Sequence, residues 1–429
     1  MLLSFRVANH RSIRDEQELS LVATEFNEGT GRDTGVRVDG KSVAALPVIG
    51  LFGANGSGKS NALSALRFMR MAVLDSFADW VREPGVPREP FELDPEAREE
   101  TSLFEVDLLL GRDPVRYTYG FEVSDERVEA EWLHAYPSGR RQVWFDREAG
   151  RPEGEGGEYR FPGTGLGGRK DEYATITRLT RPNALFLTAA ATLNHPRLSA
   201  LHRWFLDNLW LVTSRDDVPA RTRWTRERIT ARDANPNFRE RLARLLVKAD
   251  LGITGLTTDP DTGEIQLLHR TRDGGSRPLD FMQQESLGTH AWFAFLGPLL
   301  HVLDRGGTLL ADELDSSLHP RLAAEVIRMF QSREANPRTA QLVFTTHDAT
   351  LLGPSVTERP LDRDQVWITL KDTTGESALY PLTAARKARR DENLERRYLH
   401  GHYGGVPRLT AGQLAREIAA FEEELKATA

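Results

Sequence analysis

The sequence has no cysteine among its 429 residues, and it has no long apolar run. The absence of cysteine excludes disulfide bonds, cysteine-ligated zinc and a thiol nucleophile. No apolar stretch approaches the roughly 18 residues that a membrane-spanning helix needs. The N-terminal segment MLLSFRV alternates like a strand and lacks the basic head and cleavage site of a signal peptide. We therefore expect a cytoplasmic protein with no membrane partner.

A positive net charge and a heptad repeat are also missing. The formal net charge is −7, which provides no overall attraction to nucleic acid but leaves room for a local basic patch. No long heptad pattern is present, so we expect no extended coiled-coil arms. The remaining composition, 39% hydrophobic and 28% charged, is that of an ordinary soluble protein. The length allows two or three average domains, or one large α/β domain with insertions.

Residues 46–66, LPVIGLFGANGSGKSNALSAL, are the most informative segment. The apolar run at 48–52 predicts a buried strand, and the small and apolar residues that alternate after position 60 predict a helix. Between them lies the pattern G-x-x-x-x-G-K-[ST] of a phosphate-binding loop, in its required strand–loop–helix context. Glycines let backbone N–H groups approach a polyphosphate, the lysine contacts the β and γ phosphates, and the serine hydroxyl binds Mg²⁺. The expected nucleotide-binding residues are Gly53, Asn55, Gly56, Gly58, Lys59 and Ser60.

A second group of candidate residues follows the short apolar run at 308–311. This run predicts a buried strand, whose C-terminal end would place Asp312 and Glu313 at the edge of a parallel sheet where ligands bind. There Asp312 would organise Mg²⁺ through water, and Glu313 would act as general base for the water that attacks the γ phosphate. A strand that ends in two carboxylates is not specific by itself, so its neighbours matter.

Two further motifs flank this strand. Ser286 and Gly288, in the sequence SLGT, precede an expected helix, and a hydroxyl with free N–H groups at a helix N-terminus can form an anion site. An expected strand at 341–346 ends at His347, whose imidazole could bond the γ phosphate and orient the water. Taken singly, the first motif would be a helix cap and the second a structural histidine. All four motifs together indicate a nucleotide site.

With these motifs the sequence resembles the ABC-type ATPases, in the branch that contains SMC, RecF and OLD-type proteins. The resemblance implies Mg²⁺-dependent ATP hydrolysis, with Ser60 and Asp312 as metal ligands and Glu313 and His347 as catalytic residues. It also implies an ATP-dependent homodimer, or a higher oligomer, in which the signature of one subunit completes the site of another. The matching segments are Walker A at residues 53–60, the signature at 286–289, Walker B at 309–313, the D-loop at 314–320 and the histidine switch at 346–348.

The same family has an early Asn-x-Arg-Ser turn beside the nucleotide, which Arg11 and Ser12 match by position. Two features depart from the family pattern. The signature is Ser-Leu-Gly-Thr and not the transporter-type LSGGQ, and no segment, including the surroundings of Gln142, matches the glutamine loop.

The C-terminal part of the chain carries a second resemblance. Two expected strands, from 364 to about 382, precede a basic segment at 386–390 and an acidic amphipathic helix from about 411. This arrangement is similar to the tail of stand-alone bacterial AAA "ATP/GTP-binding" proteins, many of which are encoded in anti-phage or abortive-infection operons beside an effector gene. The resemblance, which covers the chain outside residues 80–280, implies an effector or toxin partner encoded nearby.

We therefore expect an α/β fold, an ABC-type P-loop NTPase core with an antiparallel β wing and a helical insertion. Strands are predicted at 102–110, 117–123, 128–136 and 142–145, and helices at 196–210 and 237–251. A glycine-rich segment at 28–42 is expected to form a mobile loop, and another at 147–170 an exposed loop. The expected divisions are an N-terminal ATPase lobe at residues 1–80, the β wing at 81–146 and the glycine-rich loop with the helical insertion at 147–280. A C-terminal ATPase lobe is expected at 281–382, and a basic tail with a terminal helix at 383–429.

A second hypothesis is a DNA-binding repair or sensing ATPase of RecF/SMC type. Its contacts would be the basic residues 221–232, with Trp224 stacked on a base, and the basic residues 386–397. For the first segment we favour the other interpretation, a solvated amphipathic helix with its tryptophan turned inward, because charge runs usually form solvated faces.

Two metal-dependent alternatives and a transporter motor receive less support. OLD-type relatives carry a metal nuclease, for which Asp362 and Asp364 would be candidate ligands. No preceding strand ends in a lone glutamate suited to the first metal position, so we do not expect a built-in nuclease. His400 and His402 have no third ligand in register. A transporter motor needs a membrane partner, and the signature and the tail argue against one.

Overall fold

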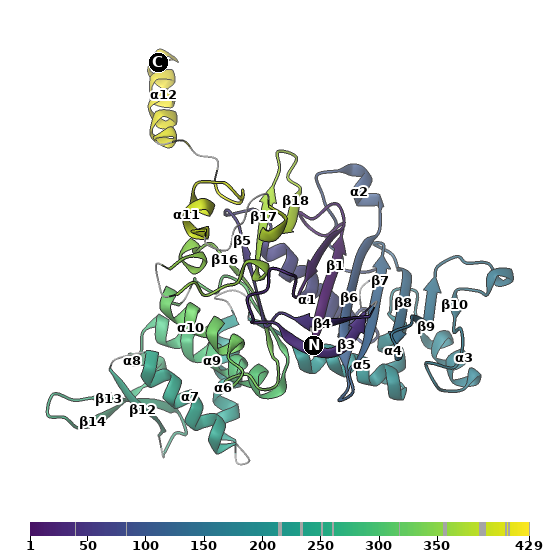
Figure 1. Ribbon diagram of the computed structural model, residues 1–429, viewed down its shortest axis with the longest axis horizontal. Coiled ribbons are helices and arrows are strands. Elements are labelled where there is room, and N and C mark those ends of the chain that lie inside the picture. Colours follow the sequence, from purple (N-terminus) through teal and green to yellow (C-terminus); the bar gives the residue numbers. More distant parts are fainter. Residues whose placement is uncertain are drawn as a thin grey trace.

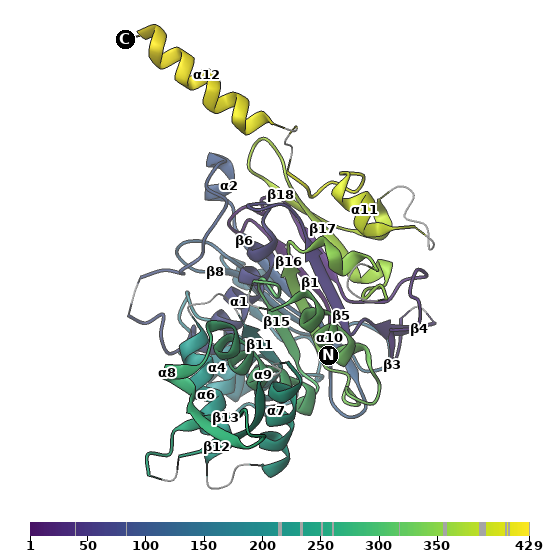
Figure 2. The same ribbon diagram turned by 90° about the vertical axis from the view of Figure 1, so that its left-hand side faces the viewer.

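The computed structural model describes most of the chain (Figure 1). The described residues form two large sheets with helices between and outside them, a helical part with a small sheet of its own, and a terminal helix that extends away from the rest (Figures 1 and 2). These residues are 1–38, 40–82, 84–212, 217–231, 235–249, 252–259, 261–316, 318–354, 358–385, 392–407, 410 and 412–428, with side chains as far as 421.

The central sheet has six strands. They are β5 (Val48–Phe52), β11 (Leu209–Val212), β15 (Thr308–Ala311), β16 (Gln341–Thr346), β17 (Val366–Lys371) and β18 (Ser377–Pro381). The spatial order is β11–β15–β16–β5–β17–β18, and every neighbouring pair except β17–β18 is parallel. The apolar runs β5, β15 and β16 are buried along their whole length, as expected for parallel strands covered on both faces. The C-terminal ends of the five parallel strands therefore share one edge.

The second sheet has seven antiparallel strands. They are β1 (Leu2–Ala8), β2 (Gln17–Ser20), β6 (Ser102–Leu110), β7 (Val115–Val123), β8 (Val128–Tyr136), β9 (Gln142–Glu148) and β10 (Tyr159–Arg160), in the order β10–β9–β8–β7–β6–β1–β2. The four predicted wing strands are confirmed by β6 to β9. Of these strands β6 pairs directly with β1, which also pairs with β2, so the N-terminal strands and the wing form one continuous sheet.

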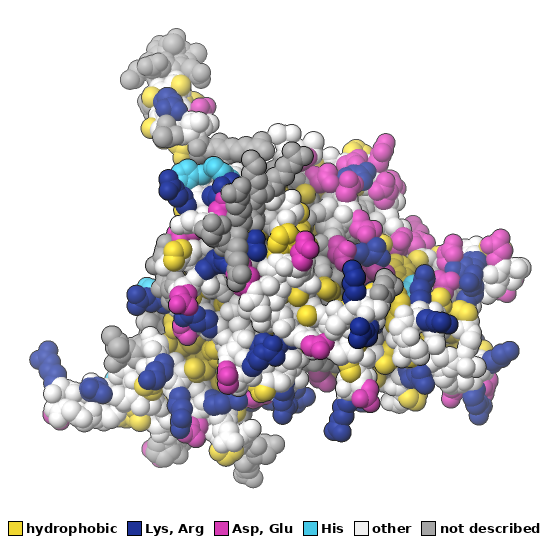
Figure 3. Space-filling model, in the orientation of Figure 1, with side chains coloured by type: hydrophobic (Ala, Val, Ile, Leu, Met, Phe, Trp, Pro, Cys, Tyr) yellow, Lys and Arg dark blue, Asp and Glu magenta, His cyan; other side chains and the backbone are white. Residues whose placement is uncertain are grey.

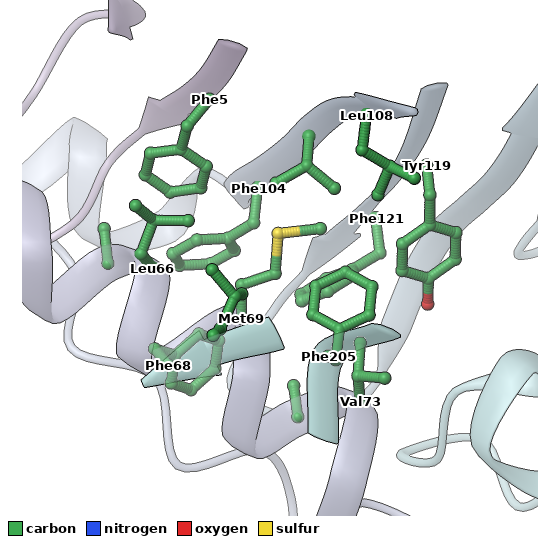
Figure 4. Packing of buried hydrophobic residues seen from close by; sticks show 14 of the residues in the cluster. Phe5, Leu66, Phe68, Met69, Val73, Phe104, Leu108, Tyr119, Phe121 and Phe205 are labelled. Atoms are coloured by element: carbon green, nitrogen blue, oxygen red, sulfur yellow. The ribbon is translucent and has the colours of Figure 1, made fainter. Parts of the chain in front are cut away.

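Three helices fill the space between the two sheets: α1 (Lys59–Asp75), α4 (Phe186–Thr192) and α5 (Pro196–Asn208). Figure 4 shows Phe68 and Met69 of α1 packed toward Phe104 and Phe121 of the antiparallel sheet, with Phe205 of α5 beside them. The other face of the central sheet is covered by α9 (Leu287–Arg305) and α10 (Pro320–Gln331). Helix α1 is therefore packed between the two sheets, and it starts at the edge of the central sheet where β5 ends.

The expected helical insertion contains more than helices. Its helices are α3 (Lys170–Leu179), α4, α5, α6 (Val218–Thr230) and α7 (Pro236–Ala249). Besides β10 and β11, which belong to the two large sheets, it contains β12 (Ile253–Thr258), β13 (Ile265–Arg270) and β14 (Ser276–Asp280), and α8 (Phe281–Gln284) follows. The predicted helices at 196–210 and 237–251 are confirmed by α5 and α7. The three-stranded sheet β12–β13–β14, which projects at the lower left of Figure 1, was not expected.

The prediction of a mobile loop at 28–42 is wrong. This segment contains the antiparallel pair β3 (Arg32–Val38) and β4 (Lys41–Ala45). Gly35, with a φ of 71°, lies at the register shift of this pair, and a glycine accommodates that left-handed conformation without steric cost. Polar and glycine-rich composition therefore marked an irregular hairpin.

The expected exposed loop at 147–170 is also partly wrong, because Arg147 lies in the core. Its side chain is 1% exposed and donates hydrogen bonds to the carbonyls of Ala184 and Pro182 and to the carboxylate of Glu158. The buried carboxylate of Glu131 lies 3.9 Å from it and accepts the first backbone N–H groups of α4. Burial raises the pKa of Glu131, while Arg147 acts in the opposite direction. This ionic group joins the sheet to α4.

The remaining helices are α2 (Pro95–Glu99), α11 (Leu394–Leu399) and α12 (Gln413–Thr428). The predicted C-terminal helix is confirmed by α12. The predicted basic segment at 386–390 lies outside the described residues. Among the helices of the described part, none combines the length and apolar character needed to cross a lipid bilayer.

Candidate nucleotide site

The glycine loop connects the end of β5 to the start of α1. Gly53 and Gly58 have no room for a side chain, since a Cβ atom would lie 2.5 Å from Ser57 Oγ at the first position and 2.2 Å from Ser377 Oγ at the second. Gly56 and Gly58 have φ angles of 76° and 100°, which favour glycine. Within the described residues no side chain caps α1, so the start of this helix is open to an anion.

Lys59 is buried at the base of this loop. Its ammonium donates hydrogen bonds to the carbonyl oxygens of Gly53 at 2.7 Å and Ala54 at 3.0 Å. Burial lowers the pKa of Lys59, and the carboxylates of Asp315 and its neighbours act in the opposite direction. The charge that a phosphate needs is therefore held inside the loop and close to acidic residues.

Ser60 and Asp312 come together across the sheet edge. The Ser60 hydroxyl donates a hydrogen bond to Asp312 Oδ1 at 2.9 Å. An octahedral Mg²⁺ with oxygens at 2.0–2.1 Å has neighbouring oxygens about 2.9 Å apart, and this ion usually takes only one or two protein ligands beside water and phosphate. The two oxygens thus fit a Mg²⁺ site. In the described part of the chain, no group of three or more His, Asp and Glu side chains forms a separate metal cluster.

Thr345 holds both acidic residues, and no sequence motif indicated it. Its buried hydroxyl donates to Asp312 Oδ1 at 2.6 Å and accepts the backbone N–H of Glu313 at 2.7 Å. Glu313 has a φ of 52°, an uncommon conformation for a residue other than glycine, and its side chain is exposed. The turn after β15 therefore directs one carboxylate to Ser60 and leaves the other free at the surface.

His347 follows the neighbouring strand β16 and pairs with a residue of the loop after Glu313. Its Nδ1 lies 3.1 Å from Asp315 Oδ2, and the imidazole is 56% exposed whereas the Asp315 side chain is only 6% exposed. The other oxygen, Asp315 Oδ1, is buried and has no hydrogen-bond partner among the described residues. A buried carboxylate at Nδ1 fixes the ring orientation and leaves Nε2 for a ligand.

The early turn at residues 9–13 lies against the glycine loop. Ser12 Oγ lies 2.7 Å from Ser377 Oγ and accepts a hydrogen bond from the Asn61 side chain at 2.6 Å. The Arg11 guanidinium instead pairs with Glu89, with Nε donating at 2.5 Å, and this contact lowers the pKa of the Glu89 carboxyl. Of the two turn residues, Ser12 thus reaches the loop, whereas Arg11 is held by an acidic neighbour.

The signature residues lie at the start of α9. Ser286 Oγ accepts the backbone N–H of Thr289 at 3.1 Å, as an N-cap does. The adjoining Leu287 is 86% exposed. A cavity of about 590 Å³ opens here; its described lining comes from residues 218–222, 282–291 and 315–318, and none of it from the glycine loop. The segment predicted to be the signature therefore lies across this cavity from the predicted D-loop of the same chain.

The basic helix α6 matches the solvated-helix interpretation. Trp224 packs against Trp210 and His301, with ring centroids 5.0 and 5.4 Å apart, and the Arg228 guanidinium lies 5.2 Å from its centroid. Its faces are therefore occupied by protein groups. Arg226 pairs with Glu264 at 2.8 Å.

The two aspartates considered as nuclease ligands have structural partners. Asp362 accepts hydrogen bonds from the Thr30 hydroxyl and the backbone of Glu28, and Asp364 accepts the backbone N–H of Thr24. Both carboxylates hold the N-terminal segment that precedes β3. His400 Nδ1 contacts the carbonyl of Arg396, the residue one turn earlier in α11.

Comparison with solved structures finds SMC head domains at 12% sequence identity. The head domain from Thermotoga maritima has a TM-score of 0.40, covering 89% of this chain and 98% of that one. The Smc head from Pyrococcus furiosus, bound to the C-terminal domain of ScpA, has a TM-score of 0.40, with 88% and 95% covered. The head from Pyrococcus yayanosii has a TM-score of 0.41, with 90% and 99% covered. No curated protein matches the sequence.

A family model, in contrast, matches residues 48–353. The matched segment includes the glycine loop, the signature, Asp312, Glu313 and His347, and it spans more than half of the 429 residues. This match confirms the expected relationship with AAA proteins of abortive-infection type. The chain belongs to the family described as "AAA domain, putative AbiEii toxin, Type IV TA system".

Proposed function

We propose that this AAA-domain protein is a Mg²⁺-dependent ATPase that dimerises around ATP and thereby controls a partner effector in cytoplasmic anti-phage defence. The observation that carries the proposal is the hydrogen-bonded group Ser60–Asp312–Thr345, with the exposed carboxylate of Glu313 next to it. It supplies a metal ligand pair and a free base at the mouth of a phosphate-binding loop.

Each residue has a distinct task in this proposal. The loop N–H groups and Lys59 bind the phosphates, and Ser60 and Asp312 would hold Mg²⁺, which would neutralise part of the phosphate charge. Glu313 accepts a proton from the attacking water, and His347, oriented by Asp315, donates toward the γ phosphate. Thr345 keeps Asp312 and Glu313 in register.

Dimerisation is supported by the position of the signature. Leu287 and Gly288, which follow Ser286, border a cavity whose described lining contains no residue of the glycine loop of the same chain, and Leu287 is exposed. A second subunit would bring its glycine loop to this surface. Contacts between the γ phosphate and the facing signature exist only in the closed pair, so ATP shifts the equilibrium toward the dimer.

Mixing two inactive variants tests the shared site. Lys59→Ala removes the positive charge that binds the phosphates, and Ser286→Arg blocks the signature, so each variant alone should be inactive. In a mixed dimer one site combines both lesions, whereas the other site is intact. If subunits pair at random and sites act independently, an equimolar mixture should regain about a quarter of the wild-type phosphate release. No recovery in the mixture, with both variants folded, would contradict a site shared between subunits.

A further inference from the structure

The terminal helix α12 presents exposed apolar side chains that no other part of the described chain covers. Figures 1 and 2 show this helix extended away from the body of the protein, beyond α11. Leu414, Ile418 and Phe421 are 64%, 67% and 59% exposed, and Figure 3 shows hydrophobic side chains on the surface of this helix. Three large apolar side chains on one isolated helix are expected to find a binding partner.

The spacing of these residues is that of a helix-pairing seam. Leu414, Ile418 and Phe421 are separated by four and then three residues, and the sequence continues this pattern with Leu425. Alternating steps of four and three place all members on one narrow line of the helix, as at the a and d positions of a coiled coil. Such a seam fits a single helix or a groove between two helices.

The charges beside the seam determine the kind of partner. With Leu414 and Phe421 at d and Ile418 at a, the charged flanking e and g positions are Glu417, Glu422 and Glu424. Residues at e and g of one helix face those of the partner helix. Two copies of α12 would place glutamate opposite glutamate in either orientation, which disfavours self-pairing. A partner with lysine or arginine beside its apolar surface would instead place positive charges opposite these glutamates.

We propose that α12 is a docking helix for a different protein, whose binding surface is an apolar helix or helical groove rimmed by lysine and arginine. The seam provides affinity and the glutamates exclude a second copy of this chain and other acidic partners. The surface lies away from the nucleotide site, so this inference does not rest on the proposed ATPase switch. Docking is expected with and without ATP.

The full chain can be tested with two designed peptides that differ only in rim charge. Both are labelled 21-residue amphipathic helices with isoleucine at a and leucine at d; one has lysine and the other glutamate at every e and g. Fluorescence anisotropy should show the basic peptide binding at least tenfold more tightly than the acidic one, with a difference that shrinks as salt rises. Equal binding, or binding of neither peptide, would overturn the proposal.

Substitutions locate the contact and separate it from other occupants. Ile418→Glu should weaken the basic peptide at least tenfold, whereas Arg416→Gln, on the same helix outside the seam, should not. Replacing Glu417, Glu422 and Glu424 by lysine should invert the preference toward the acidic peptide, a result that damage to the helix cannot produce. If Ile418→Glu instead dissociates an oligomer of the nucleotide-free chain in sedimentation velocity, or abolishes binding to phosphatidylglycerol vesicles, the occupant is a second copy or a membrane and the proposal is wrong.

Discussion

Replacing Thr345 by valine tests the support of the acidic pair without changing its carboxylates. Valine has nearly the same shape but lacks the hydroxyl that donates to Asp312 and accepts from the amide of Glu313. A hydrogen bond to a charged group contributes about 1.5–3 kcal/mol, and a buried amide left without a partner costs about 1–3 kcal/mol. Allowing for the apolar burial that valine adds, we expect the free energy of unfolding to fall by about 2 kcal/mol or more.

The effect on catalysis should be seen mainly in the metal requirement. Partners that orient a metal ligand typically change metal affinity by 10–100-fold when they are removed. The Mg²⁺ concentration for half-maximal phosphate release should therefore rise at least about tenfold in the Thr345→Val variant. Urea unfolding followed by circular dichroism and a Mg²⁺ titration of ATPase activity measure the two effects separately.

Thr369 provides a matched control in the same central sheet. It is fully buried in β17, and its hydroxyl has no partner among the described residues. Thr369→Val should therefore be neutral or slightly stabilising and should leave the Mg²⁺ requirement unchanged. If the two variants show the same urea midpoint and the same Mg²⁺ dependence, Thr345 does not position the acidic pair.

Three further predictions concern the base, the early turn and acid stability. Glu313→Gln should bind ATP and accumulate the ATP-dependent dimer in light scattering while phosphate release falls about 100-fold or more; Glu325→Gln on α10 is the control, and full turnover would refute the assigned base. Glu89→Gln should release Arg11 and tighten ATP binding several-fold in a fluorescence titration, an effect that must vanish with Arg11→Ala. Burial lowers the pKa of His10 from 6.5 to about 4, so the neutral ring contributes stability above pH 6.5 that is lost as the pH falls through 4. His10→Gln should lose less stability than the wild type between pH 7 and 4.5 in urea titrations, and parallel losses would contradict this.

The sequence predicted those parts of the site that depend on local pattern. The spacing of Gly53 to Ser60 is sufficient for a phosphate-binding loop, and an apolar run that ends in Asp312 indicates a strand edge. The approach of Ser60 to Asp312 follows once both strands are parallel members of one sheet. Thr345 could not be found in this way, because its role depends on the register of β15 and β16, in which Ala311 is level with Phe344. That register places the next residue of each strand, Asp312 and Thr345, side by side.

Local pattern was misleading where distant partners determine burial. Arg147 begins a charged, glycine-rich segment, and such a segment normally predicts an exposed loop. Its guanidinium is buried because Glu158 and the carbonyls of Ala184 and Pro182 satisfy it. The last two partners are more than 30 residues away in the sequence, and no periodicity indicates them. Strands β6 and β7 were predictable because every second residue, from Phe104 to Leu108 and from Tyr119 to Val123, is an apolar side chain in the core.

In the proposed switch, residues 312–316 and Leu318 form the part of the candidate site that would connect ATP binding to dimerisation. Its first residue, Asp312, bonds Ser60, and Asp315 holds His347. Ser316 and Leu318 line the cavity beside Gly288, at the surface where the proposed second subunit would bind. A second subunit that closed on this cavity would therefore touch the same segment that contains the proposed metal ligand Asp312 and the partner of His347. Coupling through one contiguous segment does not depend on a chain of other residues. We therefore expect Asp315→Asn to disturb both ATP turnover and ATP-dependent dimerisation.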